Sequence, residues 1–408
     1  MMSRRVPKLR FKEFSGEWDE KRLENVYDFH STNSFSRDKL NYEKGIVKNI
    51  HYGDIHTKFS TLFDITKEQV PFINSDIDLT RVKKESYCLE GDLIFADASE
   101  DVDDIGKSIE LINLNNEKVL SGLHTLLARQ KEKKLVKGFA GYLFKSNYIR
   151  EQIKKEAQGA KVLGISAKRL SNIKLFFPKD QNEQQKIANT LSSLDKFIEA
   201  GEKKVEALKK HKKGLMQQLF PQEGEKTPKL RFEEFSGEWE ESLLGNYCEI
   251  TTGKLDANAM VENGKYRFYT CAKEYYLIDK YQFDTEALLI SGNGANVGYI
   301  HYYNGKFNAY QRTYVLDQFQ IKVHFLKYFL QKNLHQRILI EKKDGNTPYI
   351  VMSTLTEMPI LLPTLPEQEK IADTLSFLDN LIEAGEKKVE ALKKYKKGLM
   401  QQMFVSEE

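Results

Sequence analysis

The sequence has few cysteines, no long apolar run and no strong charge of either sign. Its three cysteines, Cys88, Cys248 and Cys271, are odd in number and lack CxxC spacing, which argues against a disulfide scaffold or a zinc site. No apolar run approaches the roughly 20 residues of a membrane span, and the first residues lack an apolar signal core. A net charge of +4 permits an anionic partner without requiring one. We therefore expect a cytoplasmic protein without membrane association.

Patterns typical of enzymes are lacking as well. Residues 292–298 follow a predicted strand like a dinucleotide fingerprint, but the third glycine is one residue late and strand-forming residues come next. Residues 106–108 resemble the end of a Walker loop, yet Asp101 occupies the required glycine position in a solvated acidic loop. Residues 346–349 are one residue away from the Asn-Pro-Pro-Tyr of amino-methyltransferases, without a glycine-rich cofactor loop before them. HExxH and GxSxG are missing. The sequence predicts no enzyme activity, no cofactor and no metal site.

The chain does contain an internal repeat in two parts. Residues 183–220 return at 367–404 with seven differences, and a shorter element at 7–18 returns at 228–239. The two segments that follow the shorter element share neither length nor sequence. A chain with matching scaffold pieces around unlike segments is expected to present two different surfaces in one symmetric frame.

The long repeat predicts a helix with a coiled-coil seam of about 39 residues, or roughly 58 Å. Asp180 and Thr364 are expected N-caps, three residues before Glu183 and Glu367. An unpaired seam would leave its apolar stripe in water, so we expect the two copies to pair antiparallel. A glycine at one seam position of each copy predicts close crossing of the two backbones rather than a flexible defect. The seam positions of the first copy are Ile187, Leu191, Leu194, Ile198, Gly201, Val205, Leu208, Lys212, Leu215 and Leu219.

The segments at 19–182 and 240–366, called the first and second inserts, each predict a compact α+β domain with polar loops. Residues 93–96 align with 288–291 as a buried strand, and His124 lies opposite Arg312 in the alignment. Because loops vary without disturbing a scaffold, the residues that carry function are expected there. Basic, amide and aromatic side chains supply contacts to base edges and phosphates.

Polar loop residues of both inserts are therefore candidates for DNA binding. In the first insert they are Lys48, His51, Tyr52, Lys58, His124 and Lys161, with His56 and Arg169 of the same kind. In the second insert they are Lys254, Tyr269, Lys273, Asn293, Asn296, Tyr310, Gln311, Arg312, Asn346 and Tyr349, with Arg267, Tyr275 and Tyr276 of the same kind.

The order of these parts resembles the specificity subunit of a type I restriction-modification enzyme. The resemblance rests on the duplicated helix with its LPxxEQxKI-like approach at 363–371, the FxxFxGEW element and the two unlike inserts. It covers nearly the whole chain, although residues 177–180 depart from the usual Leu-Pro-Pro-Leu. It implies that each insert is a target-recognition domain that reads one half of a bipartite, asymmetric site in double-stranded DNA. It also implies a helix pair that acts as spacer and docks two methyltransferase subunits, through which restriction translocase-nuclease subunits join.

The expected architecture is α+β, with two target-recognition domains separated by two long antiparallel coiled-coil helices in pseudo-twofold symmetry. The target-recognition domains are predicted at 1–182 and 221–366, and the spacer helices at 183–220 and 367–408. The alternative function is that of a non-catalytic coiled-coil adaptor whose inserts bind protein partners. The salt dependence of binding separates the two, because contacts with phosphates release counterions.

Overall fold

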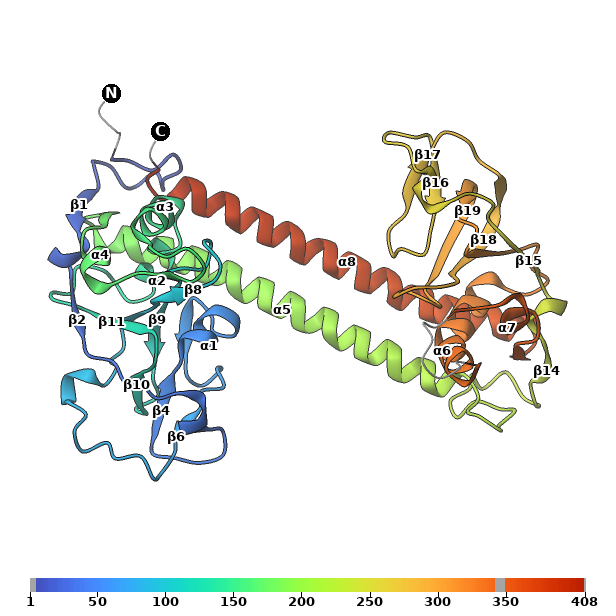
Figure 1. Ribbon diagram of the computed structural model, residues 1–408, viewed down its shortest axis with the longest axis horizontal. Coiled ribbons are helices and arrows are strands. Elements are labelled where there is room, and N and C mark those ends of the chain that lie inside the picture. Colours follow the sequence, from blue (N-terminus) through green and yellow to red (C-terminus); the bar gives the residue numbers. More distant parts are fainter. Residues whose placement is uncertain (1–4, 342–348, 407–408) are drawn as a thin grey trace. The chain divides into compact units, whose positions relative to one another are not determined.

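The computed structural model describes residues 5–341 and 349–406, and the chain divides into two compact units (Figure 1). Unit 1 consists of Met1–Gly201 and Lys388–Glu408, and unit 2 of Glu202–Lys387. Two helices contribute to both units, α5 (Gln181–Leu219) and α8 (Leu365–Met403), each of 39 residues. The predicted pair of helices of this length is confirmed. Among the described residues, no helix is long and apolar enough to cross a membrane.

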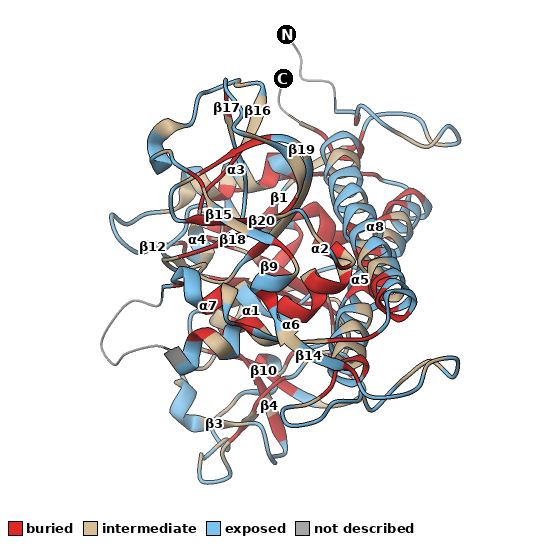
Figure 2. Ribbon diagram, turned by 90° about the vertical axis from the view of Figure 1, so that its right-hand side faces the viewer, coloured by how far each residue is buried: buried red, intermediate tan, exposed pale blue. Residues whose placement is uncertain are grey.

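In each unit the two helices pack against one another antiparallel. In unit 1 the ammonium group of Lys396 in α8 pairs with the carboxylate of Asp195 in α5. In unit 2 the helices exchange roles, and Lys212 Nζ of α5 lies 2.6 Å from Asp379 Oδ1 of α8. In each unit an aspartate of one long helix thus pairs with a lysine of the other, with the helices in exchanged roles. Most predicted seam residues are buried or half-buried, and Figure 2 shows the buried residues along one side of each helix.

Two glycines allow the helices to cross closely. A Cβ atom added to Gly201 would lie 2.8 Å from Val389 Cγ2, and one added to Gly385 would lie 2.7 Å from Val205 Cγ2. Carbon atoms normally approach no closer than about 3.5 Å. The seam glycines are therefore explained by close packing, as the sequence predicted.

The short repeated element binds the start of each long helix. Arg10 Nε lies 2.8 Å from Glu183 Oε1, and the equivalent Arg231 Nε lies 2.9 Å from Glu367 Oε1. The indole of Trp18 also donates to Glu183, at 3.3 Å. Asp180 accepts a hydrogen bond from the Asn182 amide at 2.8 Å, as an N-cap should. The two glutamates, by contrast, are buried with arginine partners and do not complete the capping arrangement that their spacing suggested.

A tyrosine of each insert binds the helix pair at an equivalent place. The hydroxyl of Tyr142 donates to Asp195 Oδ2 at 2.7 Å, and that of Tyr328 donates to Asp379 Oδ2 at 2.7 Å. Both aspartates also receive a lysine from the other helix. Each insert is thus held to a site that both long helices build together.

Unit 1 contains a five-stranded sheet in the order β2-β11-β7-β9-β5 and a four-stranded sheet in the order β10-β4-β6-β3. The strands of these sheets are β2 (Tyr27–His30), β3 (Leu40–Asn41), β4 (Val47–Ile50), β5 (Leu62–Asp64), β6 (Phe72–Ile73), β7 (Leu93–Ala96), β9 (Ser108–Asn113), β10 (Lys118–Ser121) and β11 (Thr125–Gln130). Two small sheets pair β1 (Asp19–Arg22) with β13 (Lys174–Phe177) and β8 (Ala98–Ser99) with β12 (Leu163–Gly164). The helices of the insert are α1 (Tyr52–Thr57), α2 (Phe139–Leu143), α3 (Asn147–Glu156) and α4 (Ala167–Ser171).

Unit 2 contains a six-stranded sheet in the order β15-β20-β18-β19-β16-β17. Its strands are β15 (Glu249–Thr252), β16 (Tyr266–Tyr269), β17 (Tyr276–Ile278), β18 (Phe283–Ser291), β19 (Ile300–Ala309) and β20 (Thr313–Asp317). A small sheet pairs β14 (Glu240–Leu243) with β21 (Pro359–Leu362), and the helices of the insert are α6 (Val323–Glu341) and α7 (Met352–Thr356).

The central strands of the two inserts correspond in register. Ala96 of β7 pairs with Thr125 of β11, and Ser291 of β18 pairs with Thr313 of β20. The alignment predicted from the sequence is therefore confirmed at these strands. The inserts differ next to them, because the single strand β19 stands where unit 1 has the separate strands β9 and β10.

Candidate nucleic-acid interface

In unit 2, polar loops at the strand ends are tied together by backbone hydrogen bonds. The Gly292 amide donates to Arg312 O at 2.8 Å, and the Ile350 amide donates to Gly292 O at 2.8 Å. The Tyr310 amide donates to Tyr269 O, and the Gln311 amide to Leu255 O, both at 2.9 Å. We call this connected set the unit 2 loop cluster. It comprises residues 253–256, 269–276, 291–299, 310–312 and 349–350.

The unit 2 loop cluster contains nine of the ten residues predicted for the second insert. The tenth, Asn346, lies outside the described residues. Five of the nine are exposed, namely Lys254, Lys273, Gln311, Arg312 and Tyr349, and three are half-buried, namely Asn293, Asn296 and Tyr310. Tyr269 is 2% exposed, so its side chain belongs to the interior. The predicted residues are thus brought together, apart from the burial of Tyr269.

Some of these side chains are already used within the loops. The Asn296 amide group donates to Cys271 O at 3.0 Å, and the Gln311 amide group donates to Asp256 Oδ1 at 3.0 Å. The side chains of Lys254, Lys273 and Arg312 form no hydrogen bond or ion pair with any described residue. These three cations are therefore available to an external acceptor or anion.

Unit 1 builds the corresponding loops from different residues. The Asp97 amide donates to His124 O at 3.0 Å, and the Ile165 amide donates to Asp97 O at 2.9 Å. These two bonds repeat those that Gly292 makes with Arg312 and Ile350. His124 therefore occupies the backbone position of Arg312, as the sequence alignment predicted. We call residues 51–56, 97–98, 124 and 162–169 the unit 1 loop cluster.

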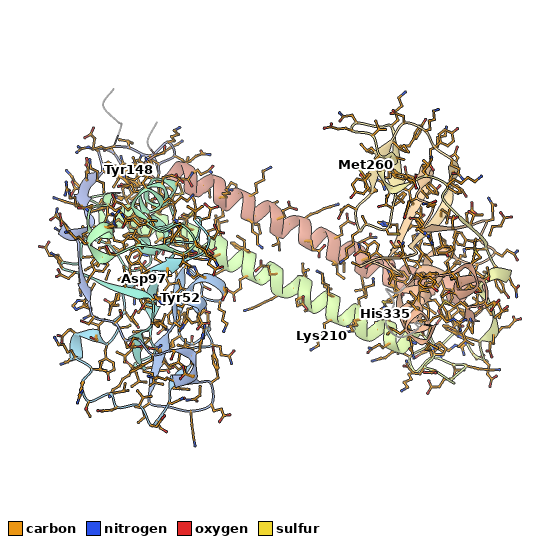
Figure 3. The ribbon with its side chains drawn as sticks, in the orientation of Figure 1. Tyr52, Asp97, Tyr148, Lys210, Met260 and His335 are labelled. Atoms are coloured by element: carbon orange, nitrogen blue, oxygen red, sulfur yellow. The ribbon has the colours of Figure 1, made fainter. Side chains whose placement is uncertain are left out.

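The unit 1 loop cluster is rich in imidazole and aromatic rings. The Tyr52 ring centroid lies 4.7 Å from that of His51 and 5.2 Å from that of His124. His124 Nδ1 lies 3.2 Å from Asp97 Oδ1, and its side chain is 51% exposed. Burial raises the pKa of the Asp97 carboxyl, whereas His124 lowers it. Tyr52 and Asp97, which both contact His124, are labelled in Figure 3.

A cleft of about 550 Å³ opens beside these rings. The cleft has a polar lining of Asp97, His124, Gln158, Ser166 and Arg169. Apolar side chains of the 162–167 segment also line it. The predicted Lys161 is exposed and adjoins this segment in the chain. Sequence reasoning did not identify Asp97 as a contact candidate. Its place directly after the buried strand β7 was the signal that could have identified it.

Three candidates of the first insert are engaged elsewhere. Lys48 Nζ lies 2.7 Å from Glu117 Oε2, and its side chain is only 14% exposed. His51 is buried and accepts a hydrogen bond from the Gly53 amide at 3.2 Å. Burial and the nearby Arg37 lower the His51 pKa to about 4, so the ring is neutral at pH 7. Lys58 Nζ lies 3.0 Å from Asp54 Oδ1, although its side chain is 51% exposed.

The loops that resembled cofactor motifs are filled by the protein's own hydrogen bonds. The amide groups of Gly292 and Gly298 donate to Arg312 O and Ser291 O, each at 2.8 Å. These amides are therefore not free to bind a phosphate group. In the acidic loop, Lys154 Nζ lies 2.7 Å from Asp103 Oδ1. Over residues 5–341 and 349–406, no group of three or more His, Cys, Asp or Glu side chains could hold a metal ion.

Comparison with known proteins gives one family. The model of the type I restriction modification DNA specificity domain matches residues 15–210 and again residues 236–394. The specificity subunit of the type I restriction enzyme EcoDI from Escherichia coli is 40% identical over 156 residues, which make up 38% of this chain and 34% of that protein. The chain thus matches about a third of that relative's length. The putative MjaX specificity subunit of Methanocaldococcus jannaschii is 27% identical over 416 residues, which cover 95% of this chain and 93% of that protein.

A solved structure shares the fold. The crystal structure of the type I restriction-modification system S subunit from M. genitalium has a TM-score of 0.66 and 18% sequence identity, covering 99% of this chain and 100% of that one. At this identity the likeness concerns the fold alone. The family model, however, matches both inserts and most of both long helices, so the chain belongs to the family of type I restriction-modification DNA specificity subunits.

Proposed function

We propose that this chain is the non-catalytic subunit that gives a type I restriction-modification complex its DNA sequence specificity. Each insert reads one half of a bipartite, asymmetric site in double-stranded DNA, and the helix pair sets the spacing of the two halves. Two methyltransferase subunits dock on the helix pair, and restriction subunits join through them.

The observation that carries this proposal is the construction of the two loop clusters. They share backbone hydrogen bonds, yet one presents His124 and Asp97 where the other presents Arg312 and Gly292. Two domains that recognise different DNA sequences require the same backbone arrangement with different polar groups. Arg312 is suited to a guanine edge, and an exposed imidazole or amide to other base edges or phosphates.

The proposed DNA contacts are the predicted residues that remain accessible. In unit 2 they centre on Lys254, Lys273, Asn293, Arg312 and Tyr349. Asn296, Gln311 and the backbone of Tyr310 and Tyr269 shape the loops that carry these contacts. In unit 1 the proposed contacts are Tyr52, His124 and Lys161, and the exposed Lys58 is a further proposed contact. Lys48 and His51 support the fold instead.

The sequence-specific role is tested by the methylome of cells that express the chain with a type I methyltransferase subunit. We expect one methylated, bipartite and asymmetric motif that depends on this chain. Binding of the complex to DNA should weaken steeply with salt, because each neutralised phosphate contributes about 0.9 to the slope of log K against log salt. Methylation without a sequence motif, or binding to protein partners with a shallow salt dependence, would favour the adaptor instead.

A second, exposed seam on each long helix supports the docking proposal. Its positions alternate by four and three residues and carry small, apolar or aromatic side chains, except for a lysine on each helix and a histidine on α5. In α5 they are Ser193, Phe197, Ala200, Lys204, Ala207, His211 and Gly214, and in α8 Phe377, Leu381, Ala384, Lys388, Ala391, Tyr395 and Gly398. We call these positions the outer seam. Phe197 is 66% exposed and Phe377 62% exposed, although both are large apolar residues.

The outer seam also contains glycines that the chain's own packing does not require. A Cβ atom added to Gly214 or Gly398 would meet no atom within 4 Å. A glycine inside a helix costs about 1 kcal/mol relative to alanine. A partner helix that packs closely on the outer seam would account for both residues. One such seam on each helix gives two docking places, which fits two methyltransferase subunits.

Docking is tested by placing a charge on the outer seam. Ala207→Glu with Ala391→Glu should weaken binding of the methyltransferase subunit at least tenfold in a pull-down titration, because the carboxylates would enter an apolar contact. Gln217→Glu with Gln401→Glu adds the same charge at exposed positions away from the seam and serves as the control. Equal binding by both variants would place the docking surface elsewhere.

The spacing role is tested by lengthening both helices. Four residues inserted after Val205 and after Val389 lengthen each helix by roughly 6 Å and approximately keep the seam. The gap between the half-sites should grow by about two base pairs at 3.4 Å each, while the bases read stay the same. An unchanged gap in the methylome would refute the spacer role and leave the helices as a docking surface only.

A further inference from the structure

Arg267 of β16 is held by three tyrosines beside the unit 2 loop cluster. Its guanidinium carbon lies 4.3 Å from the ring centroid of Tyr275 and 4.4 Å from that of Tyr303. Its Nη1 donates to the hydroxyl of Tyr269 at 3.3 Å. Contacts of a guanidinium with aromatic rings are attractive and fix the plane of the group. The orientation of the Arg267 guanidinium group is therefore set by the protein itself.

Among the described residues this guanidinium lacks the carboxylate partner that Arg231 and Arg129 have. Arg231 lies against Glu367, and Arg129 lies against Asp92 at 2.7 Å. No described acidic side chain lies within ion-pair distance of Arg267, and its Nε and Nη2 donate to no described acceptor. An oriented cation with two unused donor nitrogens, Nε and Nη2, is suited to an acceptor that comes from outside the chain.

Two of the three tyrosines that hold Arg267, Tyr269 and Tyr275, belong to the unit 2 loop cluster, and the third, Tyr303, lies in β19. Tyr269 O accepts the Tyr310 amide, and Tyr275 lies in the loop that follows β16 and is 44% exposed. The same loop is held at its base by His301 Nε2, 3.0 Å from Ala272 O. Arg267 is consequently anchored to the segments that carry the proposed contacts to bases, and a shift of those segments would move its fork.

We propose that Arg267 is a specificity-determining residue that reads one guanine in the half-site of the second insert. This rests on the proposed function. Guanine presents N7 and O6 as two acceptors in the major groove, and a planar guanidinium matches them with two parallel hydrogen bonds. Because the tyrosines orient the fork before binding, little side-chain freedom is lost when the two bonds form.

The proposal restricts the DNA sequence that this chain can recognise. The half-site read by the second insert contains at least one G·C pair, and discrimination at that pair depends on Arg267. The half-site is assigned by exchanging residues 240–366, since only the half that changes belongs to this insert. Recognition of the other half does not depend on Arg267.

The test compares methylomes and methylation rates for complexes formed with the full chain and its variants. Arg267→Ala should relax one G·C position of the second half-site, with discrimination reduced about 10- to 100-fold, the range expected for one bidentate base contact. Arg267→Lys keeps the charge but loses the planar fork, so it should keep the fold and relax the same position.

Lys306 provides a matched control on the neighbouring strand β19. Its Nζ lies 4.7 Å from the ring centroid of Tyr281, so it is also a cation on a tyrosine, but it has an acid partner, Asp284 Oδ2 at 3.9 Å. Lys306→Ala should leave both half-sites unchanged. Retained binding of the methyltransferase subunit shows that each variant is folded.

Two results would overturn the inference. One is a second half-site made only of A·T pairs, and the other is an unchanged motif and rate for both Arg267→Ala and Arg267→Lys. Failure of the proposed function looks different, because the unmodified chain would then direct no bipartite methylation at all.

Discussion

The close crossing of the two long helices can be tested by adding a single methyl group to a glycine. Gly201 and Gly214 both lie inside α5, but only the first faces another side chain, Val389 of α8. The alanine variants therefore gain the same helix propensity, about 1 kcal/mol each. Only in Gly201→Ala must the helix pair also accommodate the added Cβ atom.

The free-energy cost of accommodating this atom follows from the geometry. The added Cβ would lie 2.8 Å from Val389 Cγ2, so the valine must retreat by roughly 0.7 Å or more to reach an ordinary contact. Valine has one preferred side-chain rotamer in a helix, so the retreat moves backbone as well. Overpacking of this kind costs about 1 to 3 kcal/mol. Gly201→Ala should thus destabilise the chain by about 0 to 2 kcal/mol, whereas Gly214→Ala should stabilise it by up to about 1 kcal/mol.

Hydrogen exchange of the backbone amides in α5 measures this difference, as the free energy of local opening around each substituted residue. We expect Gly201→Ala to lie below Gly214→Ala by about 1 to 3 kcal/mol. Val389→Ala in the Gly201→Ala background should restore part of the loss, because it removes the atom that is too close. Equal protection in the two glycine variants would refute the close crossing.

Three further outcomes are expected. Exchanging residues 240–366 for the insert of another family member should change one half of the methylated motif, and a change in both halves would count against independent domains. Arg312→Ala and Asn293→Ala should each weaken recognition of the second half-site by about 1 to 3 kcal/mol with an unchanged melting temperature, and unchanged methylation would mean that neither side chain touches DNA. Burial raises the pKa of Glu110 to about 7, so the folded chain holds a proton that the unfolded chain has lost above pH 4.5. Its contribution to stability should be complete below pH 4.5 and fall by up to about 1.4 kcal/mol per pH unit towards pH 7, and a chemical denaturation series should show this slope in the wild type but not in Glu110→Gln.

The helices could be predicted almost completely because their information is local and periodic. The alternation of apolar residues fixed the seam, and the helices begin at Gln181 and Leu365, two residues before the repeat that revealed them. The repeat is bounded by sequence identity, whereas each helix begins directly after its N-cap residue. The start of each helix therefore differs from the start of the repeat by two residues. The central strand register, with Ala96 equivalent to Ser291, was also recoverable from the buried apolar runs and the threonines that face them.

The roles of single polar residues depended on distant neighbours and could not be predicted in the same way. Glu183 has the spacing of a capping residue, but Arg10 and Trp18 reach it from 165 or more residues away and bury it. Lys48 and His51 have the composition of contact residues, yet Glu117 and the start of α1 engage them. In unit 2 the local pattern agrees better with the accessibility of the side chains, because Lys254, Lys273 and Arg312 are exposed and form no ion pair with a described residue.

The core of unit 1 has a consequence for how the chain is made. Met403, Phe404 and Val405 are buried in the same core cluster as Trp18, and the Phe404 ring meets the Trp18 ring edge-on, with centroids 6.3 Å apart. During synthesis these residues leave the ribosome after more than 400 others, so unit 1 cannot close its core until they have been made. Unit 2 draws its equivalent ring, Phe220, from the segment just before Trp239 and has no such delay. A stop codon near position 400 would therefore remove buried residues from the core of unit 1 and leave the buried residues of the unit 2 core present.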